Sequence, residues 1–514
     1  MLLLLVKVFA MVIVEPWIGR KIQAAFNEAI NEYTFKIGDV HVLLIKSGIE
    51  LDNVTLSSLK RHGNPGVLNG EITLIEFKGI NIIQAIFRND IYIREIIISN
   101  VRIKGEVTFP GKTIAVRVSP VRIRIGKTLI NKIELALQDN MTARLFSMKE
   151  GVLNLYDLQI EKKDTISIGI VRKFDLDAGE LQYVTPDSIY TYQALGISYS
   201  GASNTLALDR FVMKPNYSNY DFAAQDKMEK DRIEAGFGNI NIHDFNALNY
   251  LQLGNLICSC IEVGEMDVNV FRDNRKEDNH ADIPSFQDVI YNYTGIIRID
   301  SIGLKNGNIT YTEHAEKATE AGLISFNDIN AKIYMITNDT IYKTETAYME
   351  LKGSALLMAQ GKLTLVLKAK IYDSKNAFSL CGTLSDLEAI KLNPILEKNA
   401  FFYATSGKLD IMNFCFTADN NKATGYLTMR YHGLDLAVKN KRTDDTTAVK
   451  ERLISKIVNH KVPDSNPIPG KALRKGIIDY EREPDRFLFN YCFNSILSGI
   501  KSSLIANPKR KKNS

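Results

Sequence analysis

The sequence has few of the residues that interrupt strands or crosslink small domains. Its 514 residues include only 13 prolines and 5 cysteines. The cysteines, Cys258, Cys260, Cys381, Cys415 and Cys492, are odd in number and scattered, which argues against a disulfide framework. Cys258 and Cys260 lie two residues apart on an expected strand, so their side chains should face the same way. Because no second pair completes a metal site, we interpret both as small packed residues, with a redox role as the alternative.

Sequence signatures of catalysis are also absent. No G-x-x-x-x-G-K-[ST], G-x-S-x-G or H-E-x-x-H pattern occurs, and the seven histidines are isolated from one another. We interpret Glu313-His314 as loop residues, with a general-base role as the minor alternative, and Asp273 with Arg275 as a turn. The charges of residues 481–486 are expected to form a surface ion-pair network. We therefore expect no enzyme activity, no metal site and no cofactor.

Charge of one sign is not in excess. The 64 Lys and Arg residues and 59 Asp and Glu residues leave a net charge of +5, too slight to indicate nucleic-acid binding. The content of 45% hydrophobic and 24% charged residues is typical of a folded protein. At 514 residues the chain is longer than one compact core needs, so we expect two or more domains or one elongated domain.

Long hydrophobic runs are missing except at the start. Residues 1–14 are apolar apart from Lys7, but a transmembrane helix needs about 20 residues. We interpret the run as a membrane anchor or signal-anchor; a cleaved signal peptide and a core helix are the alternatives. Trp17 suits a membrane interface or packs under the first strand. The candidate anchor residues are Leu2, Leu3, Leu4, Leu5, Val8, Phe9, Val12, Ile13 and Trp17.

The residues that follow change their hydrophobic period. Residues 15–30 carry apolar side chains three and four apart, which predicts an amphipathic helix. The period then becomes two, with slips at Gly38-Asp39, Glu95 and Asp157. Each slip moves later side chains to the other face unless an extra residue bulges out. Repeated bulges are typical of a curved sheet.

The strand pattern predicts one dry face and one wet face, and long helices that could cover the dry face are scarce. Another sheet, the curl of the sheet itself or a non-protein ligand must therefore cover it. The predicted fold is mainly β, with a long curved antiparallel sheet forming a groove. The expected sections are an anchor and amphipathic helix at 1–30, β sections at 31–230 and 231–440, and a helical tail at 441–514.

Three segments share a strand, a polar break and a second strand. They are Ile91–Val107, Leu256–Phe271 and Ile297–Tyr311, and they suggest a repeated hairpin-like unit. Between later strands, a short helix is expected over Asp386–Leu396, with Ser385 as its N-cap.

The tail contains two helix candidates, Thr447–His460 and Phe487–Ile505. The second is strongly apolar and precedes a basic run at 509–512, a combination that binds anionic membrane surfaces. A helix that caps the open end of the sheet is the other interpretation. The candidate contact residues are Phe489, Phe493, Leu497, Ile500 and Leu504.

Several weak motifs together carry a family resemblance. They are Pro16-Trp17-Ile18, Tyr33–Val40, Ile49–Leu56, Val270-Phe-Arg-Asp273, Ile297–Glu313, Asn466–Gly470, Arg474–Ile477 and Glu481-Arg482. In these the sequence resembles the AsmA-like family of bacterial envelope proteins, of the anchored type common in Bacteroidota. The short anchor with Lys7 departs from the pattern of the family.

The resemblance implies a function. AsmA-like proteins are similar to chorein-type, bridge-like lipid transfer proteins, in which a curved sheet shields acyl chains on an apolar floor. It implies an inner-membrane anchor with the bulk in the periplasm, and lipid binding or transfer that contributes to outer-membrane biogenesis. The expected partners are phospholipid acyl chains, the inner membrane, and envelope proteins or a second copy. The alternative is a non-enzymatic scaffold protein whose sheet closes on itself.

Overall fold

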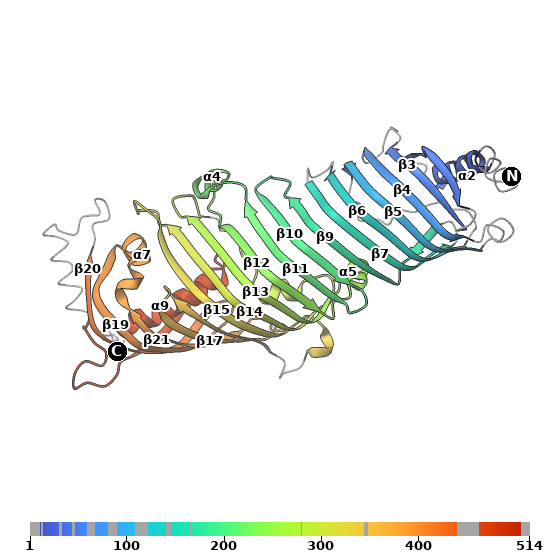
Figure 1. The fold of residues 1–514 in the computed structure, drawn as a ribbon. Coiled ribbons are helices and arrows are strands. Elements are labelled where there is room, and N and C mark those ends of the chain that lie inside the picture. The colour runs from blue at the N-terminus through green and yellow to red at the C-terminus, as the bar shows by residue number, and fades with distance from the viewer. Residues whose placement is uncertain are drawn as a thin grey trace. The chain divides into compact units, whose positions relative to one another are not determined.

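The computed structural model describes residues 11, 14–29, 33–43, 47–58, 67–80, 90–107, 122–139, 145–163, 166–278, 280–343, 348–438 and 462–504. The candidate anchor residues from Leu2 to Ile13, the helix candidate at 447–460 and the basic run at 509–512 lie outside this part of the chain. Within it, no helix combines the length and the apolar character needed to cross a membrane. The chain divides into two compact units, residues 1–212 and 213–514. Figure 1 labels the helices and strands in the order of the chain.

The first unit is a sheet with one described helix. Its elements are α2 (Glu15–Ala29), β1 (Tyr33–Lys36), β2 (Asp39–Leu43), β3 (Gly48–Ser58), β4 (Leu68–Ile80), β5 (Asp90–Val107), β6 (Arg122–Asp139), β7 (Leu145–Lys163), β8 (Ile166–Ile170), β9 (Lys173–Val184) and β10 (Tyr190–Ser200), and β11 (Thr205–Pro215) spans the boundary. β3 pairs with β1, β2 and β4; the order then runs β4, β5, β6, β7, β9, β10, with β8 also on β7.

The second unit has longer strands and more helical segments. Its elements are α4 (Asn219–Ala224), β12 (Arg232–His243), α5 (Ala247–Leu253), β13 (Leu256–Asp273), α6 (Phe286–Tyr291), β14 (Ile297–His314), β15 (Gly322–Thr337), η2 (Thr340–Tyr342), β16 (Met349–Leu357), β17 (Gly361–Ala369), β18 (Phe378–Glu388), η3 (Ala389–Leu392), α7 (Asn393–Ile395), η4 (Leu396–Ala400), β19 (Phe402–Ala418), β20 (Lys422–Val438), β21 (Lys475–Glu481) and α9 (Leu488–Leu504). The strands from β12 to β21 pair in chain order.

The mainly β prediction is confirmed, but the sheets are mixed and not wholly antiparallel. β5 pairs with β6 in parallel, and β13 pairs with β14 in parallel. At each of these joints the chain must return to the end from which the previous strand began, so a crossover replaces the tight turn of a hairpin. A hydrophobic pattern gives no strand direction, and the sequence therefore could not reveal these two joints.

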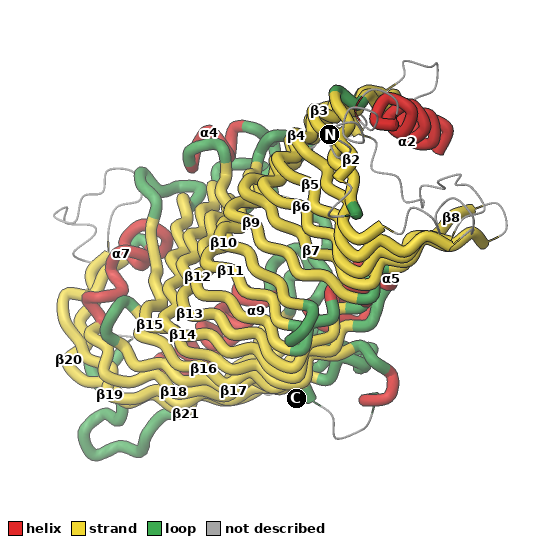
Figure 2. Tube along the Cα trace, turned by 45° about the vertical axis from the view of Figure 1, so that its right-hand side comes forward, coloured by secondary structure: helices red, strands yellow, loops and turns green. Residues whose placement is uncertain are grey.

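Left-handed residues lie side by side in neighbouring strands. In the first unit positive φ angles occur at Asn53, Asn100, Lys132, Glu150 and Gly196. The flanking pairs place these residues on one line across the sheet, with Thr73 of β4 and Gly179 of β9 between them. From β3 to β6 the pairing continues in the same register on both sides of this line, and a register shift occurs between β6 and β7. The strands therefore bend together along a shared line (Figure 2).

The second unit repeats this arrangement over fewer strands. Positive φ angles occur at Asn239, Asn306 and Asp328, and Gly264 of β13 lies opposite Asn239. From β16 to β18 the ladders are regular. Asparagine and aspartate tolerate the left-handed region because their short side chains hydrogen-bond locally. The polar breaks in the sequence are therefore left-handed or glycine positions inside continuous strands.

Two sequence predictions need correction for this reason. The three segments that suggested a hairpin-like repeat lie in β5, β13 and β14, each a single 18-residue strand. The helix expected from Asp386 begins at Ala389, because β18 continues to pair with β19 as far as Glu388. Ser385 is therefore a strand residue opposite Ile411 and no helix N-cap.

Candidate functional site

One face of the first unit is a continuous apolar strip. Because paired residues on neighbouring strands point the same way, the registers define rows that cross the sheet. We define the apolar strip as the following rows, each written in the order of the strands that it crosses. The first row is Leu51, Ile75, Ile98, Ile130, Leu153, Leu176 and Tyr199; the second is Ile49, Phe77, Ile96, Thr128, Leu155 and Phe174; the third is Val54, Ile72, Val101, Ile133 and Gly151; the fourth is Leu56, Gly70, Ile103, Leu135, Met148, Leu181 and Ala194.

The opposite face of the same strands is polar and carries ion pairs. Arg102 on β5 lies 2.9 Å from Glu134 on β6, and Lys149 on β7 lies 2.7 Å from Glu180 on β9. The row through Thr55 continues with Glu71, Arg102 and Glu134. The prediction of one dry and one wet face is therefore confirmed in this unit.

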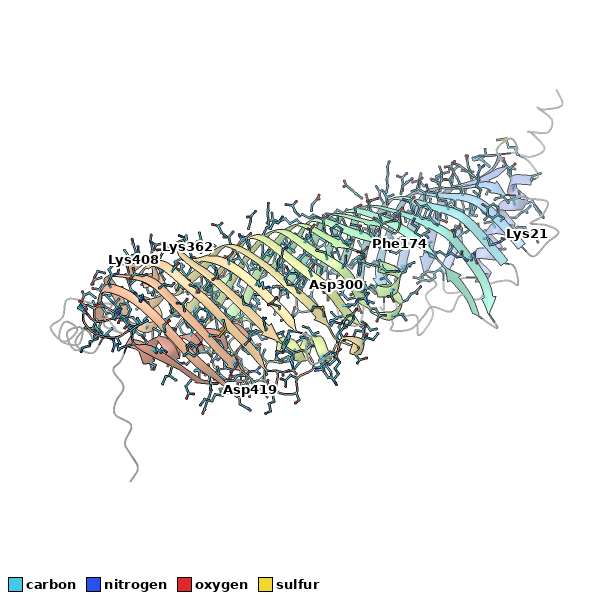
Figure 3. All side chains as sticks on the ribbon, turned by 90° about the horizontal axis from the view of Figure 1, so that it is seen from below. Lys21, Phe174, Asp300, Lys362, Lys408 and Asp419 are labelled. Carbon is cyan, nitrogen blue, oxygen red and sulfur yellow. A yellow bond between two sulfur atoms is a disulfide. The ribbon has the colours of Figure 1, made fainter. Side chains whose placement is uncertain are left out.

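The cover over the apolar strip differs from one end to the other. Leu51 and Val54 are 0% and 1% exposed, in a core to which Ile18 and Ile22 of α2 also belong. Leu153, Leu155, Leu176 and Leu181, on β7 and β9, are only partly buried. Among the described residues of this unit α2 is the only helix, and it packs on β1 and β2. No described helix of this unit therefore lies over the strip on β7, β9 and β10; Phe174 of its second row is labelled in Figure 3.

In the second unit the apolar face is covered by the chain itself. A row through Ile302 continues with Ile333, Leu351, Leu367, Leu380, Phe416, Gly425 and Ile478. Phe286 and Ile290 of α6 and Ile496 and Ile500 of α9 pack against the core formed on this face. From β15 to β21 this unit therefore covers its dry face internally.

The C-terminal helix candidate is confirmed as α9, and its candidate contact residues divide into two groups. Ile500 and Leu504 pack against the core of the second unit, and Leu497 is partly buried, as expected of a cap. Phe489 and Phe493 are 48% and 42% exposed and stack on each other. Phe489 also contacts the rings of Tyr311 and Phe326, with centroids 6.2 Å and 5.9 Å away. The packing favours the cap over the membrane-surface helix.

Trp17, the one candidate anchor residue that the structure describes, lies in the first turns of α2 and is 52% exposed. It is absent from the residues that form the core next to this helix. The interpretation in which Trp17 packs under the first strand is therefore not supported.

The charges of residues 481–486 form the predicted surface network only in part. Glu481 and Glu483 are exposed, and Arg486 lies 3.7 Å from Glu483 and 3.4 Å from Asp278. Arg486 also reaches a buried carboxylate, which the sequence did not predict.

Glu229 is fully buried and accepts from Arg272 at 2.5 Å and from Arg486. Asp231 lies 3.3 Å from Arg272, and Glu313 accepts from the hydroxyl of Tyr311 at 2.8 Å. We call Glu229, Asp231, Arg272, Glu313 and Arg486 the buried charge cluster. Through Glu229 it joins Arg486, before α9, to Arg272 of β13.

Burial sets the protonation equilibria around this cluster. Burial raises the pKa of Asp231, although the charge of Arg272 acts in the opposite direction. Burial also raises the pKa of Tyr311, and the carboxylate of Glu313 adds to the effect. His314 beside it is held by Tyr220 at 3.0 Å and by the carbonyl of Ala318 at 3.1 Å. These contacts support a structural role for Glu313-His314.

Two substitutions in the buried charge cluster should have unequal effects. Glu229→Gln should lower the free energy of unfolding by about 3 kcal/mol, because it removes the fully buried carboxylate that Arg272 and Arg486 share. The remaining ion pairs, to Asp231 at 3.3 Å and to Asp278 at 3.4 Å, are longer. Asp231→Asn should change it by less than about 1 kcal/mol, because it removes a carboxylate that is poorly solvated. Urea unfolding monitored by circular dichroism measures both; equal losses in the two variants would contradict this assignment.

The raised pKa of Asp231 also sets the direction in which the stability of the fold changes with pH. The folded state holds this proton more tightly than the unfolded state, so stability from this group increases as the pH falls through the folded pKa. Asp231→Asn should remove this increase. Unfolding curves of the variant and the wild type between pH 7 and pH 4 measure the difference.

One pair of cysteines forms a disulfide that the sequence did not predict. Cys381 and Cys415 lie directly opposite each other on β18 and β19 and form a disulfide. The scattered spacing concealed the pair, because only the register of two strands brings them together. Cys258, Cys260 and Cys492 are free. Burial raises the pKa of Cys258 to about 11, as expected of a packed thiol.

Arg275 donates to Asp273 at 2.8 Å and lowers its pKa, as the predicted turn requires. In the part of the chain that the structure describes, no group of three or more His, Cys, Asp or Glu residues could hold a metal ion.

Comparisons with known proteins do not assign the chain to a family. No protein-family model matches the sequence, and no curated protein matches it. The apolar strip therefore carries the functional argument on its own geometry.

Proposed function

We propose that the apolar strip of the first unit binds the acyl chains of lipids. The observation that carries the proposal is that Leu153, Leu155, Leu176 and Leu181 line a continuous apolar face and are only partly buried. Burying apolar surface contributes about 25 cal/mol per Å², so an acyl chain is a sufficient cover. A solvated polar ligand would gain nothing from such a lining.

The dimensions of the strip suit this ligand. The first row crosses seven strands, from Leu51 to Tyr199, and strands about 4.8 Å apart give it a length of about 29 Å. One leaflet of a bilayer core is about 15 Å thick. An extended acyl chain therefore fits along the rows without leaving the strip.

The setting we propose is an envelope protein anchored in the inner membrane, with its bulk in the periplasm and a role in lipid transfer to the outer membrane. The disulfide between Cys381 and Cys415 supports an oxidising compartment. The resemblance to AsmA-like proteins supports the same setting. The strip has no chemistry for bond making, so the proposal does not include catalysis.

A scaffold protein is the second candidate. It is favoured by the second unit, in which α6 and α9 cover the apolar face from within the chain. If the first unit were covered in the same way, no lipid would be needed for its stability. The two candidates differ in what touches Leu181.

Photo-crosslinking tests the proposal on the full-length protein in cells. A photoreactive amino acid replaces Leu181 on the apolar strip or its neighbour Gln182 on the polar face. We expect lipid adducts in mass spectra at Leu181, at least tenfold above those at Gln182. Equal yields at the two positions, or protein adducts alone at Leu181, would favour the scaffold.

A further inference from the structure

The last strand of the second unit has its outer edge closed by a helix. β21 pairs with β20 on one side. On the other side the amide of Ile477 donates to Ser502 Oγ and the amide of Asp479 donates to Ser498 Oγ, both at 3.1 Å. Two strand residues cover about 6.6 Å and four helix residues about 6 Å. A helix antiparallel to the strand thus presents a serine to each of these two amides.

The first unit uses the same spacing at its first strand. The amide of Phe35 donates to Asn27 Oδ1 at 2.7 Å, and the amide of Ile37 donates to Gln23 Oε1 at 3.4 Å. Again a step of four along the helix matches a step of two along the strand in the opposite direction. Glu15 of the same helix accepts from the amide of Val42 in β2 at 2.9 Å.

An uncovered edge strand is a template for pairing with another chain. Side chains that accept from its outward amides remove that template without adding a strand. We infer that α2 and α9 are edge caps, and that the edge of β21 beneath α9 is a self-association site which this helix holds closed. The partner that fits the edge is a second copy of the same strand.

Charge complementarity identifies this partner. A two-fold axis at Ile478 places Ile477 of one copy opposite Asp479 of the other, and these are the two residues whose amides bond to the serines of α9. The same register places Lys475 opposite Glu481 at both ends of the strand pair. Such a dimer is isologous and closed, since the same patch serves both copies.

Gly499 is the position at which a substitution should release α9 from β21. A Cβ at Gly499 would lie 2.7 Å from Cγ1 of Ile478 and 3.2 Å from Cβ of Leu427. The close approach of α9 to β21 therefore depends on the missing side chain. Gly499→Leu should release the helix and leave the other contacts of β21 with β20 intact.

Sedimentation of the full-length protein in a mild detergent tests the inference. We expect the wild type to be monomeric and G499L to form dimers with an association constant at least tenfold higher. Limited proteolysis reports whether α9 is released. If α9 stays docked in G499L, Ser498→Pro breaks the helix and is judged by the same criteria.

Release of α9 also exposes apolar surface, so the site of association needs its own control. Ile477→Pro removes an outward amide, which an edge strand tolerates, and should return G499L to a monomer. Lys475→Glu should weaken the G499L dimer, and Lys475→Glu with Glu481→Lys should restore it. Three outcomes would overturn the inference. The first is a G499L variant that releases α9 and stays monomeric, and the second is a G499L dimer that Ile477→Pro does not dissociate. The third is a wild-type protein that is already a dimer and that Ile477→Pro converts to a monomer.

Discussion

Replacing Leu153 and Leu176 together by glutamate should remove lipid from the first unit. The two residues are cross-strand neighbours at the centre of the apolar strip and are only partly buried. An unpaired charge facing an acyl chain costs several kcal/mol, and a loss of tenfold corresponds to about 1.4 kcal/mol. With the photoreactive residue at Leu181, we therefore expect at least a tenfold fall in lipid adducts.

A matched control is available on the other face. Asn154 lies opposite Asp175 on the same two strands, so Asn154→Glu places two carboxylates side by side without touching the strip. We expect this variant to keep the lipid adducts of the wild type. If both variants lose lipid equally, charge repulsion between β7 and β9 is the cause and the strip is not the binding surface.

Removing the disulfide should produce the largest loss of stability. Cys381 and Cys415 are 34 residues apart in sequence, and the chain-entropy model gives about 4 kcal/mol for closing such a loop. Cys381→Ser with Cys415→Ser should lower the Tm of the second unit by roughly 5–10 °C. Scanning calorimetry with and without a reducing agent measures this effect.

The free thiols provide the control for this prediction. Cys260→Ser should leave the Tm within about 2 °C, because Cys260 has no disulfide partner. A reducing agent should lower the Tm of the wild type and of C260S but not that of the double variant. A wild-type Tm that does not respond to reduction would contradict the prediction.

The sequence predicted several local features because their causes are local. Alternation of apolar and polar residues gave the strands and their dry face, and the slip at Asp157 is a left-handed residue in β7. The spacing of apolar residues gave α9, which differs from its expected bounds by one residue at each end. Each of these features depends on residues fewer than five positions apart, which is the range of a hydrophobic period.

The candidate site was predicted as a type of surface but not in its position. The sequence could not say that α6 and α9 cover the apolar face of the second unit while β7 and β9 keep partly exposed leucines. It missed the buried charge cluster as well, because Glu229 and Arg486 are 257 residues apart. No local signal marks a carboxylate that two distant guanidinium groups will enclose.

What the sequence by itself determined is therefore the chemistry of each strand: its two faces and the positions at which the alternation slips. The tertiary structure decided the two parallel joints, the pairing of Cys381 with Cys415, and the edges at which Ser498, Ser502, Gln23 and Asn27 accept from strands. The physical reason is that register and strand order are set by contacts between residues far apart in the chain. A pattern of period two is satisfied equally well by any neighbour that presents an apolar row.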